Sequence, residues 1–103
     1  MRWKETLYTR RLRRPIDEST REAITSEFSR RRHEIPVPAE LRWSASKPEF
    51  TVVTQWLSLL ARFTPEQLVV DAEMTFAARM FATAENKKTA VRIIESLADD
   101  LGL

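Results

Sequence analysis

The chain has 103 residues, of which 43% are hydrophobic and 31% are charged, and its formal net charge is +2, which is typical of one globular domain over 1–103. The absence of cysteine excludes disulfides and cysteine nucleophiles, and the single histidine excludes a metal site built from several histidines. A single glycine argues against a β-rich fold, since tight hairpins often need glycine, and we therefore expect an all-α fold of about four helices.

Residues 1–15 are expected to form a basic arm or a short helix. The spacing of Trp3 and Leu7 suits one face of a helix, whereas residues 6–9 could equally be a short strand. No other segment looks like a partner strand, so helix or extended arm is favoured.

Residues 16–34 are predicted to form the first well-marked helix. Ser19 and Glu22 have the spacing of a capping box, which places a helix from Thr20 to about His33. Two prolines between residues 35 and 38 bias the chain toward extended conformation, so residues 35–47 read as a linker.

Residues 48–103 are predicted to form a core of three helices. Ser46 with Glu49, and Thr64 with Gln67, again have capping-box spacing, and each pair precedes an apolar segment. Gly102 suits the position just after a helix. The three expected helices run from Ser46 to about Arg62, from Thr64 to about Thr83, and from about Asn86 to Leu101.

The expected binding residues are two arginine clusters in the first half of the chain. Residues 1–47 hold 12 Lys and Arg against 7 Asp and Glu, whereas residues 48–103 hold 5 against 8. Guanidinium groups pair bidentately with phosphate or carboxylate, although solvated charge is the commoner fate of such clusters. The clusters comprise Arg10, Arg11, Arg13, Arg14, Arg30, Arg31 and Arg32.

These arginines favour a non-enzymatic regulatory or accessory protein that binds an anionic macromolecule, with nucleic acid as the first expectation. The alternative is a protein-interaction module, such as an adaptor, inhibitor or small complex subunit, whose arginines contact an acidic protein surface. No residue spacing predicts catalysis, a metal site or a cofactor. The chain has no apolar run near the ~20 residues that a membrane span needs, so we expect a cytoplasmic protein without membrane contact.

A subunit interface is expected around Trp56. The predicted helix from Ser46 to Arg62 is apolar on more than half of its circumference, which predicts burial against a second copy or a partner protein. We therefore expect a homodimer or a complex subunit. The expected interface residues are Val52, Trp56, Leu59 and Phe63.

Two questions remain open at this stage. A helix from Thr20 to Arg32 would hold the arginine clusters about 18 Å apart, unless the N-terminal residues return along it. The clusters then form either one anion-binding face or two solvated ends. In addition, Asp99 and Asp100 lie near the end of the last predicted helix, where acidic residues oppose the helix dipole.

Overall fold

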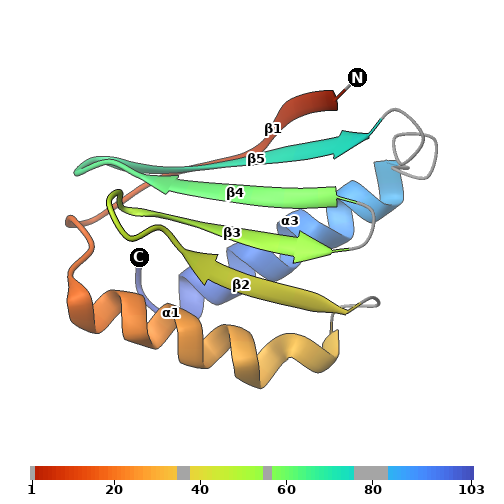
Figure 1. Cartoon of the computed structure of the whole chain (residues 1–103). Helices are drawn as coiled ribbons and strands as arrows, with labels where there is room; N and C mark the ends of the chain where they lie inside the picture. Colours follow the sequence, from red (N-terminus) through yellow and green to blue (C-terminus); the bar gives the residue numbers. More distant parts are fainter. Residues whose placement is uncertain (1, 35–37, 55–56, 76–83) are drawn as a thin grey trace.

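The described residues form one antiparallel sheet with two helices packed on it (Figure 1), so the prediction of an all-α helical bundle is wrong. The computed structural model describes residues 2–34, 38–54, 57–75 and 84–103. Five strands lie in the order β1-β5-β4-β3-β2. In chain order the elements are β1 (Arg2–Arg11), α1 (Glu18–Arg31), the 3₁₀ helix η1 (Arg32–Glu34), β2 (Ala39–Trp43), β3 (Glu49–Thr54), β4 (Leu57–Phe63), β5 (Gln67–Thr75) and α3 (Ala84–Asp100).

The N-terminal segment is a strand and not an arm or a helix. β1 pairs antiparallel with β5, and its Cα register runs from Arg2 opposite Thr75 to Arg11 opposite Gln67. The partner strand lies more than 50 residues away in sequence, inside a segment that helical spacing had assigned to a helix. Local periodicity could not reveal this pairing because it is a long-range contact.

The two predicted helices between Ser46 and Thr83 are wrong, and three antiparallel strands occupy most of this region. In β4 and β5 the buried apolar residues alternate, at Ala61 and Phe63 and at Leu68, Val70 and Ala72, as the pleat of a strand with one covered face requires. Apolar residues also occupy many positions on the other face of these strands. The same segments therefore also carry apolar residues at helical spacing. The predicted linker 35–47 contains β2, and its residues 35–37 lie outside the described residues.

Two hairpin turns made of described residues use hydroxyl side chains where glycine was expected. The Thr64 hydroxyl accepts hydrogen bonds from the backbone N–H groups of Glu66, at 3.3 Å, and Gln67, at 3.0 Å. The Ser44 hydroxyl accepts in the same way from the N–H groups of Ser46 and Lys47, at 3.3 and 3.2 Å. Among the described residues only Gly102 has a positive φ, so these turns need no glycine and the argument from glycine content fails.

The first and last predicted helices are confirmed. α1 begins after Asp17, whose carboxylate accepts from the Thr20 N–H at 2.8 Å, so the cap is Asp17 and not Ser19. The last helix is α3, and Gly102 follows it with φ +69°, the left-handed conformation typical of a helix terminus.

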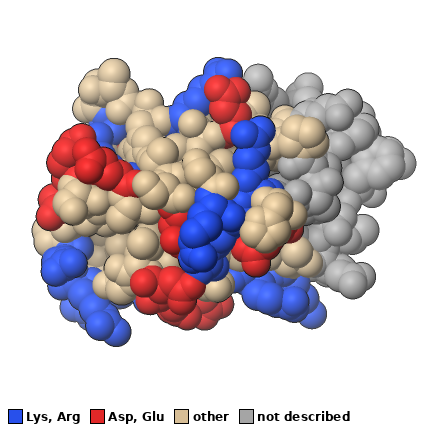
Figure 2. Space-filling model, turned by 90° about the horizontal axis from the view of Figure 1, so that it is seen from below, with Lys and Arg blue, Asp and Glu red and all other residues tan. Residues whose placement is uncertain are grey.

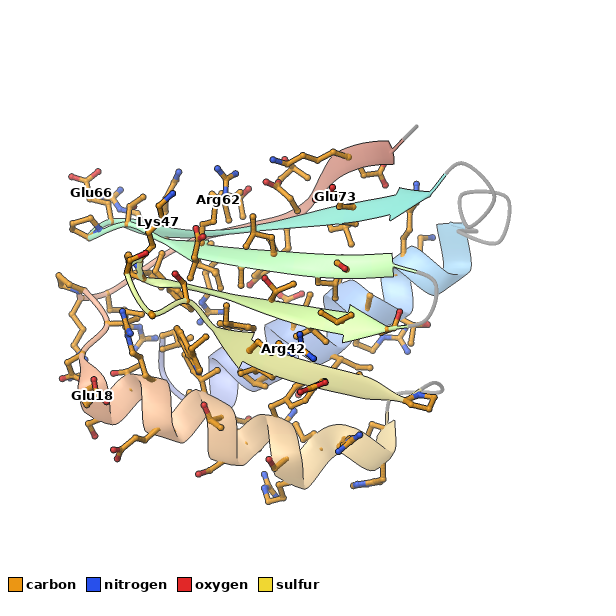
Figure 3. The ribbon with its side chains drawn as sticks, in the orientation of Figure 1. Glu18, Arg42, Lys47, Arg62, Glu66 and Glu73 are labelled. Carbon is orange, nitrogen blue, oxygen red and sulfur yellow. The ribbon has the colours of Figure 1, made fainter. Side chains whose placement is uncertain are left out.

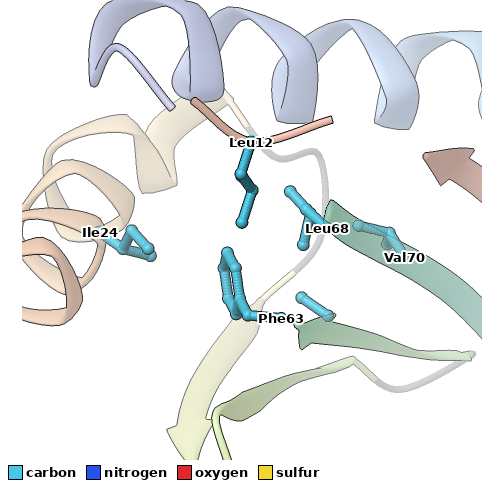
Figure 4. Close-up of a cluster of buried hydrophobic side chains, with 6 residues drawn as sticks. Leu12, Ile24, Phe63, Leu68 and Val70 are labelled. Carbon is cyan, nitrogen blue, oxygen red and sulfur yellow. The ribbon is translucent and has the colours of Figure 1, made fainter. Parts of the chain in front are cut away.

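The core lies between the sheet and the two helices. Leu12, Ile24 and Phe63 point toward one another together with Leu68 (Figure 4), and each is less than 10% exposed. Ile94 of α3 and Leu101, directly after α3, pack against the same cluster, so α1 and α3 cover one face of the sheet. No described helix covers the other face, which carries the half-buried aliphatic residues Val53, Leu60 and Val69.

Candidate anion-binding surface

Arg10, in the first arginine cluster, is held inside the structure. Its guanidinium donates to the Asp99 carboxylate at 2.6 Å and to the backbone oxygen of Leu103 at 3.1 and 3.2 Å. A fourth hydrogen bond reaches the Tyr8 hydroxyl at 3.3 Å. The contacts with Tyr8 and Asp99 raise the pKa of Arg10, and only 19% of its side chain is exposed. Arg10 therefore fastens the end of β1 to the end of α3.

Arg31, in the second cluster, is held in a similar way. It pairs with Glu27 one turn earlier in α1, at 2.7 Å, and it reaches across to the Ser96 hydroxyl at 2.9 Å and to Asp100. Arg30 pairs with the same Glu27, and the two arginines together lower the pKa of that carboxyl to about 2. Arg31 is 12% exposed and Arg30 is 70% exposed, so only Arg31 is enclosed.

The end of α3 is therefore the meeting point of the two clusters. Asp99 pairs with Arg10, and Asp100 pairs with Arg31. These ion pairs explain why two acidic residues stand where the helix dipole disfavours them, because each contacts a cation from another element. One arginine of each cluster thus serves the fold.

Besides Arg30, which pairs with Glu27, four members of the clusters remain, and they lie at opposite ends of α1. Arg11, Arg13 and Arg14 occupy the end of β1 and the segment that leads to α1, whereas Arg32 begins η1 at the far end. The 14-residue helix separates these ends by about 21 Å. All four side chains are exposed and form no ion pair with a described residue. On the helix side of the molecule, basic and acidic side chains are interspersed and do not form a single basic face (Figure 2).

The segment with Arg11, Arg13 and Arg14 is anchored by the leucine between them. Leu12 is 7% exposed, and its N–H donates to the backbone oxygen of Glu66 at 2.8 Å. The three guanidinium groups are therefore presented from a fixed backbone at the β4–β5 end of the sheet. We call these three residues the arginine triplet.

The turns beside the arginine triplet carry charges of both signs. Lys47, in the turn between β2 and β3, lies at the same end of the sheet as Glu66 (Figure 3). Arg14 also contributes to the lowered pKa of Asp17, although the hydrogen bonds from Thr20 are the larger cause. The arginine triplet therefore lies at an end of the sheet that also carries Lys47 and the carboxylates of Asp17 and Glu66.

A buried carboxylate on the uncovered face was not anticipated from the sequence. Asp71 is 2% exposed, and it accepts from the Thr6 hydroxyl at 2.7 Å and from Arg62 at 2.6 Å, with Lys4 at 3.9 Å. Its only sequence signal is an acidic residue within the apolar alternation of β5. Because both carboxylate oxygens of Asp71 accept a hydrogen bond, we infer that Asp71 stabilises the sheet.

The predicted interface residues lie mostly inside the protein's own core. Val52 and Phe63 are 8% and 5% exposed, and Leu59 packs against the same core from β4. Trp56 lies outside the described residues. Val52 and Phe63 are therefore buried within the protein, and Leu59 is half-buried against its core.

Trp43, Phe50 and Phe63 form a cluster of aromatic side chains that packs at the core. Trp43 packs against Phe50, with ring centroids 4.8 Å apart, and its ring N–H donates to the Thr25 hydroxyl at 2.8 Å. The guanidinium of Arg21 lies over the Trp43 ring, 5.1 Å from its centroid. The Trp43 ring is thus occupied by contacts within the protein and is not an open platform for stacking a base.

Other site types find no support in the described part of the chain. There, no group of three or more His, Asp or Glu residues could hold a metal ion. Neither of the helices described has the length and apolar character that crossing a membrane requires. Comparison with protein-family models, with curated proteins and with solved structures finds no match to this chain.

Proposed function

We propose that this chain is a non-enzymatic, cytoplasmic accessory or regulatory protein that binds an anionic macromolecule, namely nucleic acid, through the arginine triplet. The observation that supports the proposal is the fixed presentation of Arg11, Arg13 and Arg14. Their side chains are exposed and unpaired with any described residue, while Leu12 holds their backbone in the core.

The proposed mode of binding is contact with phosphates and not with bases. Guanidinium groups form paired hydrogen bonds with phosphate oxygens, and such contacts carry no sequence information. The rings of Trp43, Phe50 and Phe63 contact one another at the core, so base stacking is not part of the proposed mode. We therefore expect weak sequence preference and steep salt dependence, with a log–log slope of about one unit for each phosphate neutralised.

Fluorescence anisotropy with a labelled DNA duplex and a labelled single strand tests this proposal. Binding is expected at about 50 mM salt and is expected to weaken strongly at about 200 mM. The double variant Arg13→Gln/Arg14→Gln is expected to lower the salt slope by about two units. The matched control Lys88→Gln/Arg92→Gln removes the same charge from exposed positions on α3 and is expected to bind like the wild type. Absence of binding at low salt contradicts the proposal.

A protein-interaction module is the second candidate, supported by the uncovered face of the sheet. Val53, Leu60 and Val69 remain half-buried there without a described helix above them. Arg11 and Arg62 lie on the same face, where they could meet an acidic protein surface. A homodimer or a complex subunit is the proposed form. Analytical ultracentrifugation of wild type and Val69→Asp at micromolar concentration tests self-association, and a wild-type monomer throughout excludes the homodimer.

A further inference from the structure

We propose that the groove between β1 and α3 binds an extended acidic peptide segment of a partner protein. This depression has a volume of about 510 Å³ and lies on the opposite edge of the sheet from β2. It is separate from the arginine triplet, so the inference does not rest on the proposed nucleic-acid site. The residues that line it are Thr6, Leu7, Lys87, Lys88, Val91, Arg92 and Glu95.

A β-bulge turns an apolar side chain of β1 toward this groove. In the register with β5, Thr6 lies opposite Asp71 and Tyr8 lies opposite Val70, which leaves Leu7 without a partner position. A bulge bends its strand and redirects the extra side chain. Leu7 is half-buried and meets Val91 of α3 in the lining of the groove, so the two residues provide an apolar floor.

The wall formed by α3 is mostly positive. Lys88, Val91, Arg92 and Glu95 follow the spacing of one helical face, and all four line the groove. Lys88 and Arg92 are exposed and form no ion pair with a described residue. Lys87 is already paired with Glu5 at 2.6 Å, which fixes this part of α3 against β1. Two cations therefore remain for an acidic ligand.

The open edge of β1 favours an extended peptide as the occupant. β1 is the last strand of the sheet and pairs only with β5 among the described residues, so its other edge offers backbone donors and acceptors. Extended segments bind such edges by adding a strand, and side-chain pockets give the specificity. The bulge interrupts a long regular ladder, which disfavours indiscriminate pairing and leaves room for a short segment.

The length and pattern of the ligand follow from the groove. The face from Lys87 to Glu95 is about 12 Å long, which matches about four extended residues. Side chains two residues apart point the same way in an extended chain. One apolar side chain over Leu7 and Val91, with an acidic side chain two positions away on each side, would place the two acidic residues about 13 Å apart. Lys88 and Arg92 are about 6 Å apart along α3, so their long side chains would extend in opposite directions along the groove to pair with them. A phosphate backbone would not use the apolar residues of the groove, whereas the apolar side chain of the peptide would.

The test uses the full chain and a fluorescent peptide with Glu-Thr-Leu-Thr-Glu at its centre. Binding measured by anisotropy is expected to weaken about tenfold with Lys88→Glu/Arg92→Glu, because two attractive pairs become repulsive. The matched control Arg13→Glu/Arg14→Glu makes the same charge change at the arginine triplet and is expected to keep peptide binding. Peptides with Gln for both Glu, or with Ser for Leu, are expected to bind more weakly. In ¹⁵N-labelled protein, the peptide is expected to shift the amide signals of Thr6, Leu7 and Val91.

The outcomes separate this inference from the proposed function. Equal peptide binding by wild type and Lys88→Glu/Arg92→Glu, or amide shifts elsewhere on the protein, overturns it. If Lys88→Glu/Arg92→Glu loses DNA binding and the wild type binds no peptide, the groove belongs to nucleic acid. That result also overturns the inference. Peptide binding that persists when no nucleic acid binds leaves the inference standing while the proposed function fails.

Discussion

Arg10 donates a hydrogen bond to Asp99, with 2.6 Å between Nη1 and Oδ1, and this contact joins the end of β1 to the end of α3. The same guanidinium donates twice to the backbone oxygen of Leu103. Residues 89 positions apart are thereby held together at the margin of the core. An arginine expected to bind a partner thus closes the fold.

Replacing Arg10 by alanine is expected to lower the free energy of unfolding by about 1–3 kcal/mol, because several charge-assisted hydrogen bonds are lost. Asp99→Asn is expected to cost about 0–1 kcal/mol, since that carboxylate is largely exposed. Urea denaturation followed by circular dichroism measures both. Arg13→Ala is the control and is expected to change stability by less than about 0.5 kcal/mol. Equal costs for Arg10→Ala and Arg13→Ala would show that Arg10 does not join β1 to α3 in solution.

Glu27 is expected to make stability fall in acid. Hydrogen bonds from Arg30, and then from Arg31, lower its pKa from 4.5 to about 2. A carboxyl whose pKa is lower in the folded state stabilises the fold fully above its unfolded pKa, and this contribution is lost as the pH falls through the folded pKa. The stability difference between wild type and Glu27→Gln is therefore expected to be largest near neutral pH and to shrink between about pH 5 and pH 2.

Unfolding free energies measured across this pH range test the contribution of Glu27. Glu22→Gln is the matched control, since Glu22 is exposed on the same helix and forms no ion pair with a described residue. Its difference from wild type is expected to stay nearly constant. A Glu27→Gln difference that does not change with pH would contradict the pairing with Arg30 and Arg31.

Asp71 and Arg62 are expected to be energetically coupled on the uncovered face. Their oxygen and nitrogen lie 2.6 Å apart, and the Asp71 side chain is 3% exposed while that of Arg62 is 46% exposed. Asp71→Ala is expected to cost about 1–3 kcal/mol, because the Thr6 hydroxyl and Arg62 both lose their acceptor. A double-mutant cycle with Arg62→Ala is expected to give a coupling of at least about 0.5 kcal/mol. The control cycle combines Asp71→Ala with Arg42→Ala. It is expected to give no coupling, because Arg42 pairs with Glu40 and not with Asp71.

The sequence predicted the two helices well, but of the sheet it offered only a short strand at residues 6–9, as the less favoured alternative. α1 and α3 have local signals, namely a cap at one end of α1 and a left-handed glycine after α3. The strands depend on long-range pairing, since β1 at the start of the chain pairs with β5 in its second half. Strand residues such as Val53, Leu60 and Val69 are apolar although they face away from the helices. This second apolar set hid the alternation that identifies a half-buried strand.

Anion binding by the seven arginines stays a prediction. Sequence spacing could not distinguish Arg10 and Arg31, which pair with Asp99 and Asp100, from the exposed arginine triplet. The unusual place of those two aspartates on α3 was the available signal. Asp71 and the groove at Leu7 depend on sheet register, which no local pattern specifies.

Thr64 provides a direct test of the strand assignment. A threonine followed three residues later by glutamine reads as a helix cap, yet here its hydroxyl accepts from the N–H groups of Glu66 and Gln67 within a hairpin turn. Its own N–H donates to the backbone oxygen of Gln67 at 2.8 Å, which closes the hairpin. Thr64→Ala is therefore expected to cost about 1 kcal/mol, whereas Thr64→Ser, which keeps the hydroxyl, is expected to cost less. Backbone chemical shifts measured on the same samples decide the assignment, since Cα values of residues 67–75 below the random-coil reference indicate β5 and values above it would restore a helix beginning at Thr64.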